Sequence, residues 1–273
     1  MPVPSSTGRA LAAALSLAIA IVLCAAIGAN VEAQVARLAP STCVSFGCYC
    51  EADAAHGPRE VVDAWSSLAP AVAGAALLWS ALGARRSAGT ALTRSRIPTL
   101  LLSGAASSIA VFSFQYHATH TLLGEWLDAT SLYLLAGFTI AWRIARLRAL
   151  PVRGFVLVYG GIVATPAALA WAFPATRKVA FVALATAAIV IEVVARRKGA
   201  ATGRGGLLGF AVGSFVLASV AWTLDWTRRV CDPTSVFQLH AAWHVLSAPT
   251  ILALHAYLAS EADGDRAIVE GAA

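Results

Sequence analysis

Long stretches without charged side chains recur along the chain and alternate with short polar segments. A helix that crosses a hydrocarbon layer about 30 Å thick needs roughly 20 apolar residues. Eight stretches come close to this length and predict helices over residues 10–28, 64–84, 97–119, 126–142, 154–173, 179–195, 206–225 and 237–260. Polar residues do not recur at every second position within them, as the strands of a membrane barrel would require. We therefore expect an all-α, polytopic membrane protein.

The predicted helices divide the chain into four parts. Residues 61–260 hold a seven-helix domain, residues 34–60 form a polar segment with cysteines, and residues 261–273 form a tail. Residues 1–33 contain Arg9, the first apolar stretch and a small residue, Ala33, at a candidate cleavage point. This pattern fits either a signal peptide or an extra transmembrane helix. Both alternatives deliver the cysteine segment to the same side of the membrane.

The composition excludes a water-soluble protein. Of the 273 residues, 59% are hydrophobic and 12% are charged, whereas soluble domains carry about 25% charged residues. The net charge of +6 does not indicate nucleic-acid binding, because Lys and Arg fall in short clusters between the apolar stretches rather than along one face. We expect a lipid bilayer and a membrane lipid, and not nucleic acid, as partners.

The basic clusters orient the predicted helices. The first, third and fifth connections of the seven-helix domain hold twelve basic residues: Arg85, Arg86, Arg94, Arg96, Arg143, Arg146, Arg148, Arg153, Arg196, Arg197, Lys198 and Arg204. The opposite side holds six: Arg37, Arg59, Arg177, Lys178, Arg228 and Arg229. Because cytoplasmic loops are enriched in Lys and Arg, we predict that residues 34–60 lie outside and that the tail is cytoplasmic. The Arg-rich, Ala-rich and Gly-rich composition suggests a bacterial cell membrane.

Polar residues within or beside the predicted spans gather at one depth. They are Ser113, His117, Asp128, Asp225, His240 and His244. Because successive helices run in opposite directions, all six fall near the outer ends of four helices. Ionisable groups inside a membrane are rare and are candidates for a functional role. His120 and His255 are interpreted as interfacial or packing residues.

Helical spacing groups these candidates further. Ser113 and His117 are four residues apart, as are His240 and His244, so each pair lies on one face of its helix. Three imidazoles with a fourth position left open predict a catalytic zinc site, in which bound water becomes a nucleophile. Asp128 would orient that water or take its proton, and Ser113 would hydrogen-bond a developing oxyanion. The alternative interpretation is that the histidines only form hydrogen bonds between packed helices.

Four of the five cysteines fall on the predicted outer side, where thiols can oxidise. They are Cys43, Cys48, Cys50 and Cys231, whereas Cys24 lies in the first apolar stretch. Four cysteines allow three disulfide pairings. Metal ligation by Cys43, Cys48 and Cys50 is the alternative, although their spacing lacks a second half of the CxxC type.

Three patterns agree in order and spacing with one known family. They are SxxxH at residues 113–117, an aspartate eleven residues beyond that histidine at position 128, and HxxWH at residues 240–244. From about residue 48 onward, the chain resembles the alkaline ceramidase family. That family belongs to a seven-helix superfamily that also includes the progestin and adiponectin receptors.

The resemblance implies a function for the seven-helix domain. It implies zinc bound by His117, His240 and His244, with Ser113 and Asp128 as catalytic partners. Residues 61–260 would then be a hydrolase domain that cleaves the amide bond of ceramide or a similar lipid. A metal-containing receptor or sensor of the related branch is an alternative. A transporter of protons or small solutes ranks last, because the polar residues collect at one end instead of tracing a path across the bilayer.

The resemblance also implies a calcium site in front of the first core helix. Its ligands would be Glu51, Asp53 and Asp63. Cys48 stands where the family has an acidic residue, and a solvated loop is the alternative interpretation for Glu51 and Asp53.

A disulfide pairing is implied in the same way. In the family, a cysteine of the amino-terminal stretch bonds one in the sixth connection. This implies a bond between Cys50 and Cys231 and leaves Cys43 to pair with Cys48.

Overall fold

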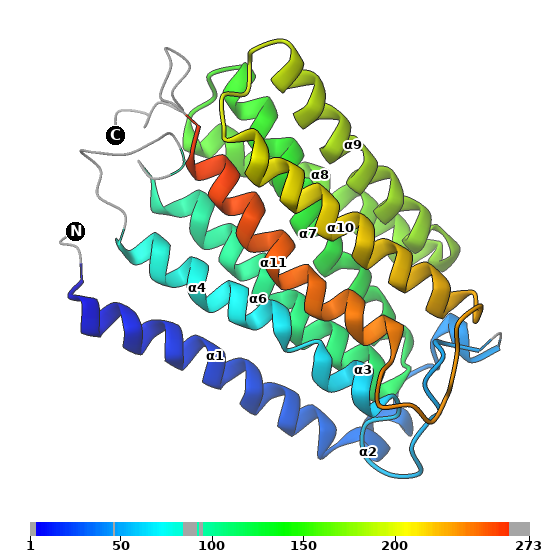
Figure 1. Ribbon diagram of the computed structural model, residues 1–273. Coiled ribbons are helices and arrows are strands. Elements are labelled where there is room, and N and C mark those ends of the chain that lie inside the picture. The colour runs from blue at the N-terminus through cyan, green and yellow to red at the C-terminus, as the bar shows by residue number, and fades with distance from the viewer. Residues whose placement is uncertain (1–3, 46, 84–91, 93–94, 262–273) are drawn as a thin grey trace.

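The computed structural model describes residues 4–45, 47–83, 92 and 95–261, and this part of the chain contains helices and no strand. Each of the eight predicted stretches lies in a helix or helix pair, so the expected all-α class is confirmed (Figure 1). The long helices are α1 (Ser6–Gly28), α4 (Ala69–Gly83), α6 (Arg96–Thr119), α7 (Leu122–Leu147), α8 (Val152–Ala172), α9 (Arg177–Arg197), α10 (Gly205–Trp226) and α11 (Leu239–Ala259). Short helices are α2 (Val31–Val35), η1 (Thr42–Ser45), α3 (Val61–Ser66) and η2 (Pro174–Thr176).

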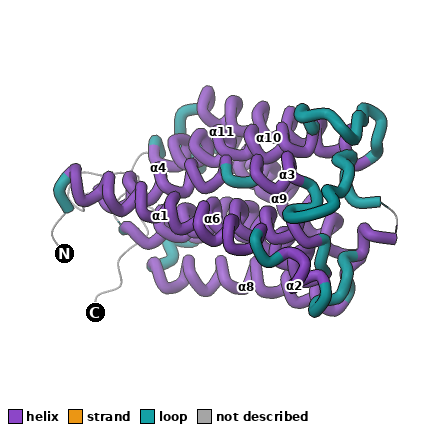
Figure 2. The backbone as a smooth tube through the Cα atoms, turned by 90° about the horizontal axis from the view of Figure 1, so that it is seen from below, coloured by secondary structure: helices purple, strands orange, loops and turns teal. Residues whose placement is uncertain are grey.

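The long helices form one bundle in which α6, α7 and α11 each pack against several neighbours. Helix α11 contacts α10 and α4, while α7 contacts α6, α8 and α9. Helix α1 lies on the edge of the bundle against α4 and α6 (Figure 1). The polar loops and α2 gather at one end, which also carries two disulfides and is called the disulfide end below (Figure 2).

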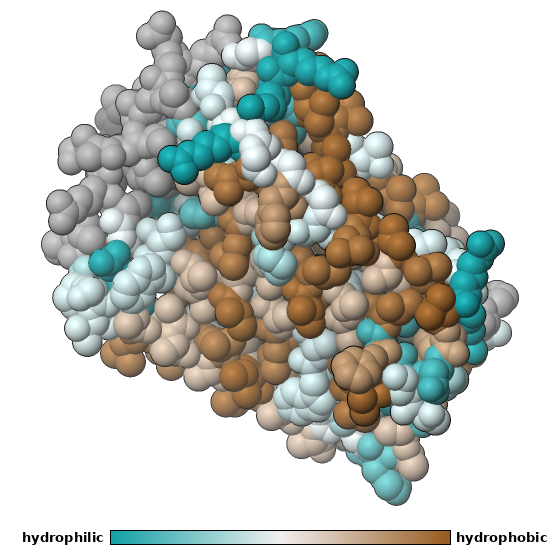
Figure 3. Space-filling model, in the orientation of Figure 1, coloured by the Kyte–Doolittle hydropathy of each residue, from teal (hydrophilic) through white to brown (hydrophobic). Residues whose placement is uncertain are grey.

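Within the described part of the chain, six helical segments are long and apolar enough to cross a membrane, which supports a multi-pass membrane protein. They are Ser6–Gly28, Val61–Gly83, Arg96–Thr119, Val152–Ala172, Pro174–Arg197 and Gly205–Trp226. Helices α7 and α11 have comparable length but contain more polar residues, including Asp128 and Arg143 in α7 and three histidines in α11. Apolar side chains cover most of the visible flank between more polar ends (Figure 3).

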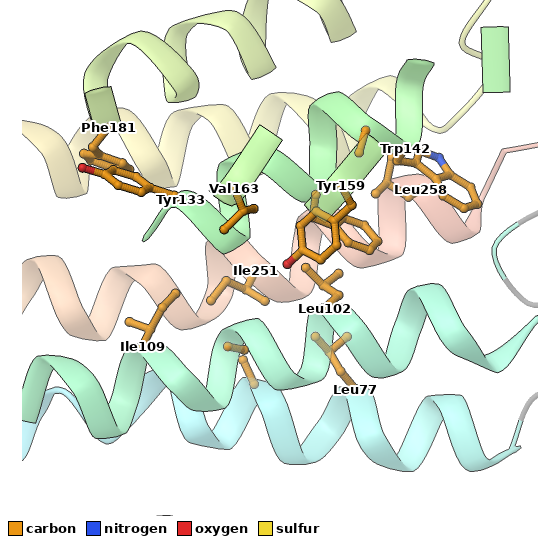
Figure 4. Packing of buried hydrophobic residues seen from close by; sticks show 14 of the residues in the cluster. Leu77, Leu102, Ile109, Tyr133, Trp142, Tyr159, Val163, Phe181, Ile251 and Leu258 are labelled. Carbon is orange, nitrogen blue, oxygen red and sulfur yellow. The ribbon is translucent and has the colours of Figure 1, made fainter. Parts of the chain in front are cut away.

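Aromatic and branched side chains fill the centre of the bundle. Trp142 and Phe138 of α7 pack against Phe155 and Tyr159 of α8, and Ile251 of α11 lies among them (Figure 4). Close approach of α4 and α6 depends on Gly74, where a Cβ atom would collide with Ser107. Small residues at such crossings let helix backbones approach closely, as in other membrane bundles.

A buried ion-pair network joins three segments at the end opposite the disulfides. The Arg143 guanidinium of α7 donates two hydrogen bonds to Glu192 of α9, at 2.9 and 2.7 Å, and one to Glu261 after α11, at 2.6 Å. Tyr257 donates to the same Glu192 carboxylate at 3.0 Å. Because every charge has a partner of opposite sign, the network links α7, α9 and the end of α11 without a lone buried ion.

Some sequence predictions fall at boundaries or outside the described residues. The stretch expected over residues 64–84 is two helices, α3 and α4, separated at Ser67 and Leu68. The last helix begins at Leu239 rather than at residue 237. Arg85, Arg86, Arg94 and tail residues 262–273 lie outside the described residues. Cleavage after the first stretch, and the division into four parts, stay predictions.

Candidate metal centre

The structure brings the three predicted histidines together at the disulfide end. His117 lies in the last turn of α6, and His240 and His244 lie in the first two turns of α11. All three side chains are buried, and one ring nitrogen from each falls within 4.8 Å of the others. The Nε2 atoms of His117 and His240 are 3.0 Å apart. Helical spacing alone could pair His240 with His244, but only the packing of α6 beside α11 adds His117.

Hydrogen bonds behind two of the rings determine which nitrogen faces the centre. His117 Nδ1 lies 2.6 Å from Glu60 Oε2, and an ionised carboxylate only accepts, so Nδ1 carries the proton. The Ser66 hydroxyl donates its hydrogen to the carbonyl of Asp63 at 2.9 Å. It therefore accepts from His244 Nδ1, which is 2.8 Å away. Both rings then present an Nε2 lone pair to the centre, as a metal site requires.

His240 is held by other contacts. Its ring stacks on Tyr49 with the centroids 3.7 Å apart. Its backbone N–H donates to Asp225 at 3.1 Å, and the second oxygen of that carboxylate accepts from the Cys50 N–H at 2.9 Å. Asp225 therefore positions α11 and the cysteine segment relative to α10. The three histidines, fixed in this way, fit a metal ion that takes neutral imidazole ligands.

Ser113 and Asp128 lie at the same centre, as the sequence predicts. Ser113 Oγ is 3.1 Å from His244 Nε2. Both residues line a polar cavity together with His240 and His244. The structure thus places a hydroxyl of α6 beside a ring nitrogen and a carboxylate of α7 in the same cavity.

Glu60 is one of the site residues that sequence reasoning missed, together with Tyr49 and Ser66. It is buried immediately before α3, and its carboxylate contacts both His117 and His120, the latter at 3.2 Å. Burial alone would raise the pKa of Glu60, but the hydrogen bond from His117 and the adjacent His120 ring outweigh it and lower the pKa to about 2. The one available signal was an acidic residue at the border of an apolar stretch, where a solvated position is the ordinary expectation.

The residues expected to bind calcium are not gathered into one group among the described residues. Both oxygens of Glu51 accept from α3 backbone N–H groups, those of Val62 at 2.7 Å and Asp63 at 2.9 Å. Asp53 is exposed and pairs with Arg59 at 3.0 Å. Asp63 is buried, and its carboxylate groups with Glu60 and His117 instead. Calcium binding stays a prediction.

The cysteines pair as the resemblance implies. One disulfide joins Cys43 to Cys48, and the other joins Cys50 to Cys231 across 181 residues of sequence. Cys24 of α1 is a free, buried thiol. The second disulfide ties the segment that carries Tyr49 to the connection between α10 and α11.

A family model described as Ceramidase matches residues 47–267 of this chain. The chain belongs to the ceramidase family. A search among curated proteins finds no match. The ceramidase match starts after α1 and α2, and it includes the cysteine pair Cys50 and Cys231, Glu60 and all three histidines. Membership in this family indicates a hydrolase that acts on amide bonds of lipids, and the structure contains buried His, Glu and Asp groups that could hold a metal ion.

Proposed function

We propose that this ceramidase-family protein is a zinc-dependent integral-membrane amidohydrolase that cleaves the amide bond of ceramide or a similar lipid amide. The observation that carries the proposal is the convergence of three imidazoles beside Ser113 and Asp128. His117, His240 and His244 would hold the ion. When bound, zinc lowers the pKa of a water molecule and polarises a carbonyl group.

The residues around the histidines supply the remaining chemistry. Asp128 accepts a proton from the attacking water and returns it to the nitrogen of the departing amine. The Ser113 hydroxyl, close to His244 Nε2, donates a hydrogen bond to the substrate oxygen as negative charge develops there. Glu60 and Ser66 keep two imidazole rings in the required tautomer and orientation.

An apolar cavity next to the polar one supports a lipid substrate. It lies between α7, α9, α10 and α11, and it has an empty volume of about 780 Å³, including its open side. Leu132, Phe181 and Trp243 line both cavities, so the two are adjacent at these side chains. A hydrocarbon chain in the apolar cavity would hold its amide group at the histidines, because the polar groups converge only at that end.

The test uses purified protein in detergent with three variants. We expect about one zinc per chain by elemental mass spectrometry, together with ceramide hydrolysis. His244→Ala should abolish both, whereas His255→Ala, on the same helix, should retain both. Asp128→Asn should keep its zinc but lose activity by about 10²–10⁴-fold in kcat, the range of general acid–base catalysis.

Two outcomes would contradict the proposal. Active protein without zinc would exclude the metal, and zinc-loaded protein that hydrolyses no lipid amide would favour the receptor alternative.

A further inference from the structure

Two consecutive cations line the polar cavity and have no part in the proposed hydrolysis. Arg177 and Lys178 form the first turn of α9, and both line the cavity that also contains His240 and His244. A helix amino terminus carries partial positive charge and ordinarily favours acidic residues. No acidic residue occupies the first turn of α9, and no side chain caps it. The helix end and its two cations together form a positive corner of the cavity.

Arg177 is buried, but only some of its guanidinium nitrogens have a hydrogen-bond or ion-pair partner. It is 3% exposed; its Nε donates to the carbonyl of Ala170 at 3.2 Å, and its Nη1 lies 2.8 Å from Glu125 Oε2. The Glu125 carboxylate is shared, because it also accepts from the backbone and the hydroxyl of Thr42. Among the described residues, Arg177 Nη2 has no hydrogen-bond partner. A buried guanidinium nitrogen without a partner is costly, which points to a missing ligand.

Lys178 forms no ion pair among the described residues, although Glu125, the partner of Arg177, lines the same cavity and attracts its charge from a distance. Its Nζ lies 4.0 Å from the centre of the Trp226 ring and 6.0 Å from that of Tyr49. These cation–π contacts place the ammonium group at the cavity but do not cancel its charge. The cavity also contains Asp128, whose position at the histidines assigns it to the reacting bond. The two cations therefore have spare capacity to bind an anion.

The order of residues along α9 relates this corner to the substrate. Phe181, one turn after Arg177, lines both cavities, and Ala185, Ala188 and Glu192 continue along the apolar one. At about 1.5 Å per residue, this face of α9 extends about 22 Å from Arg177 to Glu192. An acyl chain bound in the apolar cavity would therefore extend along α9 away from Arg177 and Lys178. The amine-derived part of the same amide then lies on the side of Arg177 and Lys178.

We propose that the substrate is a fatty acyl amide whose amine-derived part carries an anionic group, a carboxylate or a phosphate, bound by Arg177 and Lys178. This inference rests on the proposed amidohydrolase function and names its substrate class. Guanidinium and ammonium groups at a helix amino terminus recognise both anions through charge-assisted hydrogen bonds. Hydrolysis adds one water across the amide and releases a fatty acid and an anionic amine.

The experiment compares matched anionic and neutral substrates on the purified protein. One pair is N-palmitoylglycine and N-palmitoylethanolamine, and the other is ceramide 1-phosphate and ceramide. We expect kcat/KM to favour the anionic member of one pair by about ten-fold or more, because a hydrogen bond to a charged group contributes about that factor. A preference within the first pair identifies the anion as a carboxylate, and a preference within the second pair identifies it as a phosphate.

Variants assign the preference to the two cations. Lys178→Met should lower the anionic-to-neutral ratio several-fold, and Lys198→Met, the same change at the far end of α9, should leave the ratio unchanged. Arg177→Met alone would leave the Glu125 carboxylate without its ion-pair partner, so it is combined with Glu125→Gln. This double variant should remove the preference for the anionic substrate. Equal cleavage of both members in both pairs, or an equal loss on both members in Lys178→Met, would overturn the inference.

A binding measurement separates this inference from the proposed function. The His244→Ala variant lacks one proposed metal ligand but retains Arg177 and Lys178. We expect tritiated N-palmitoylglycine or ceramide 1-phosphate to bind this variant more tightly than its neutral counterpart, even if no amide is ever cleaved. Equal affinities for anionic and neutral members would overturn the anion site, whatever the outcome for hydrolysis.

Discussion

Individual hydrogen bonds to the outer nitrogens of the histidines determine whether the site can hold a metal. Glu60 accepts from His117 Nδ1, Ser66 accepts from His244 Nδ1, and Tyr49 stacks on His240. Each contact comes from the chain between the first disulfide and α4, which contributes no ligand itself. This segment therefore orients the imidazoles before an ion arrives, and partners of this kind strengthen metal binding.

Removal of the Glu60 carboxylate should weaken the metal site. We expect Glu60→Gln to lower zinc affinity by about 10–100-fold, the usual effect of losing a hydrogen-bond partner of a ligating histidine. Competition with a fluorescent zinc chelator measures this affinity. Glu32→Gln is the matched control, since Glu32 is exposed at the same end and its carboxylate accepts from the backbone N–H of Gly57. Unchanged affinity in Glu60→Gln would show that His117 is not a ligand or is oriented in another way.

Sequence periodicity could predict the residues that come from regular helices. Ser113, His117, His240 and His244 were found from their spacing, because a helix fixes which side chains share a face. Glu60 and Tyr49 could not be found in this way. They reach the histidines from an irregular segment. The path of this segment depends on the disulfides and on the contact with Asp225, and the local sequence pattern predicts neither of these.

At the scale of elements, the apolar stretches predicted the helices well because length and hydropathy suffice to define a membrane span. The break between α3 and α4 was missed although the sequence marks it with Pro70, the second residue of α4. A proline has no N–H to donate to the carbonyl of Ser66 and is tolerated only in the first turn of a helix. Between the two helices, the Ser67 hydroxyl donates to the carbonyl of Ala64 and lies 3.4 Å from that of Ala110. The break leaves α3 as a short helix whose Ser66 reaches His244.

The ion-pair network at the far end should be essential for the packing of α9. We expect Arg143→Met to lower the free energy of unfolding by about 3–5 kcal/mol, because Glu192 and Glu261 would remain buried without a partner. Thermal denaturation in detergent measures the loss. Arg148→Met, just beyond the same helix, is the control, because Arg148 is exposed. Equal stability of both variants would show that water already reaches the network.

At the scale of the molecule, the helical bundle includes a helix, α1, that lies outside the residues matched by the ceramidase family model. The match begins at residue 47, but α1 packs on α4 and α6, with Ala20 and Cys24 buried against them. Arg9 lies 4.8 Å from the centre of the Trp79 ring of α4. Retention of α1 as an extra transmembrane helix would preserve these contacts, and the choice between this alternative and a signal peptide stays a prediction.

The distribution of basic residues predicts the orientation of the whole bundle. Ala175 and Arg197 flank α9 at opposite ends, about 30 Å apart along the helix, which is the thickness of a hydrocarbon core. We expect a membrane-impermeant maleimide to label Ala175→Cys in intact cells and Arg197→Cys only after permeabilisation. Cys24, the free cysteine of the described residues, is buried and gives little background. Reversed labelling would place the histidines on the cytoplasmic side.

The division of the histidines between α6 and α11 has a consequence for biosynthesis. His117 leaves the ribosome early, whereas His240 and His244 belong to the last long helix of the described chain. Until residue 240 is made, a nascent protein therefore offers only one of these three imidazoles and cannot capture a metal ion through all of them. If the proposed function holds, metal loading follows insertion of α11, and a chain that ends before residue 239 would be inserted in the membrane without activity.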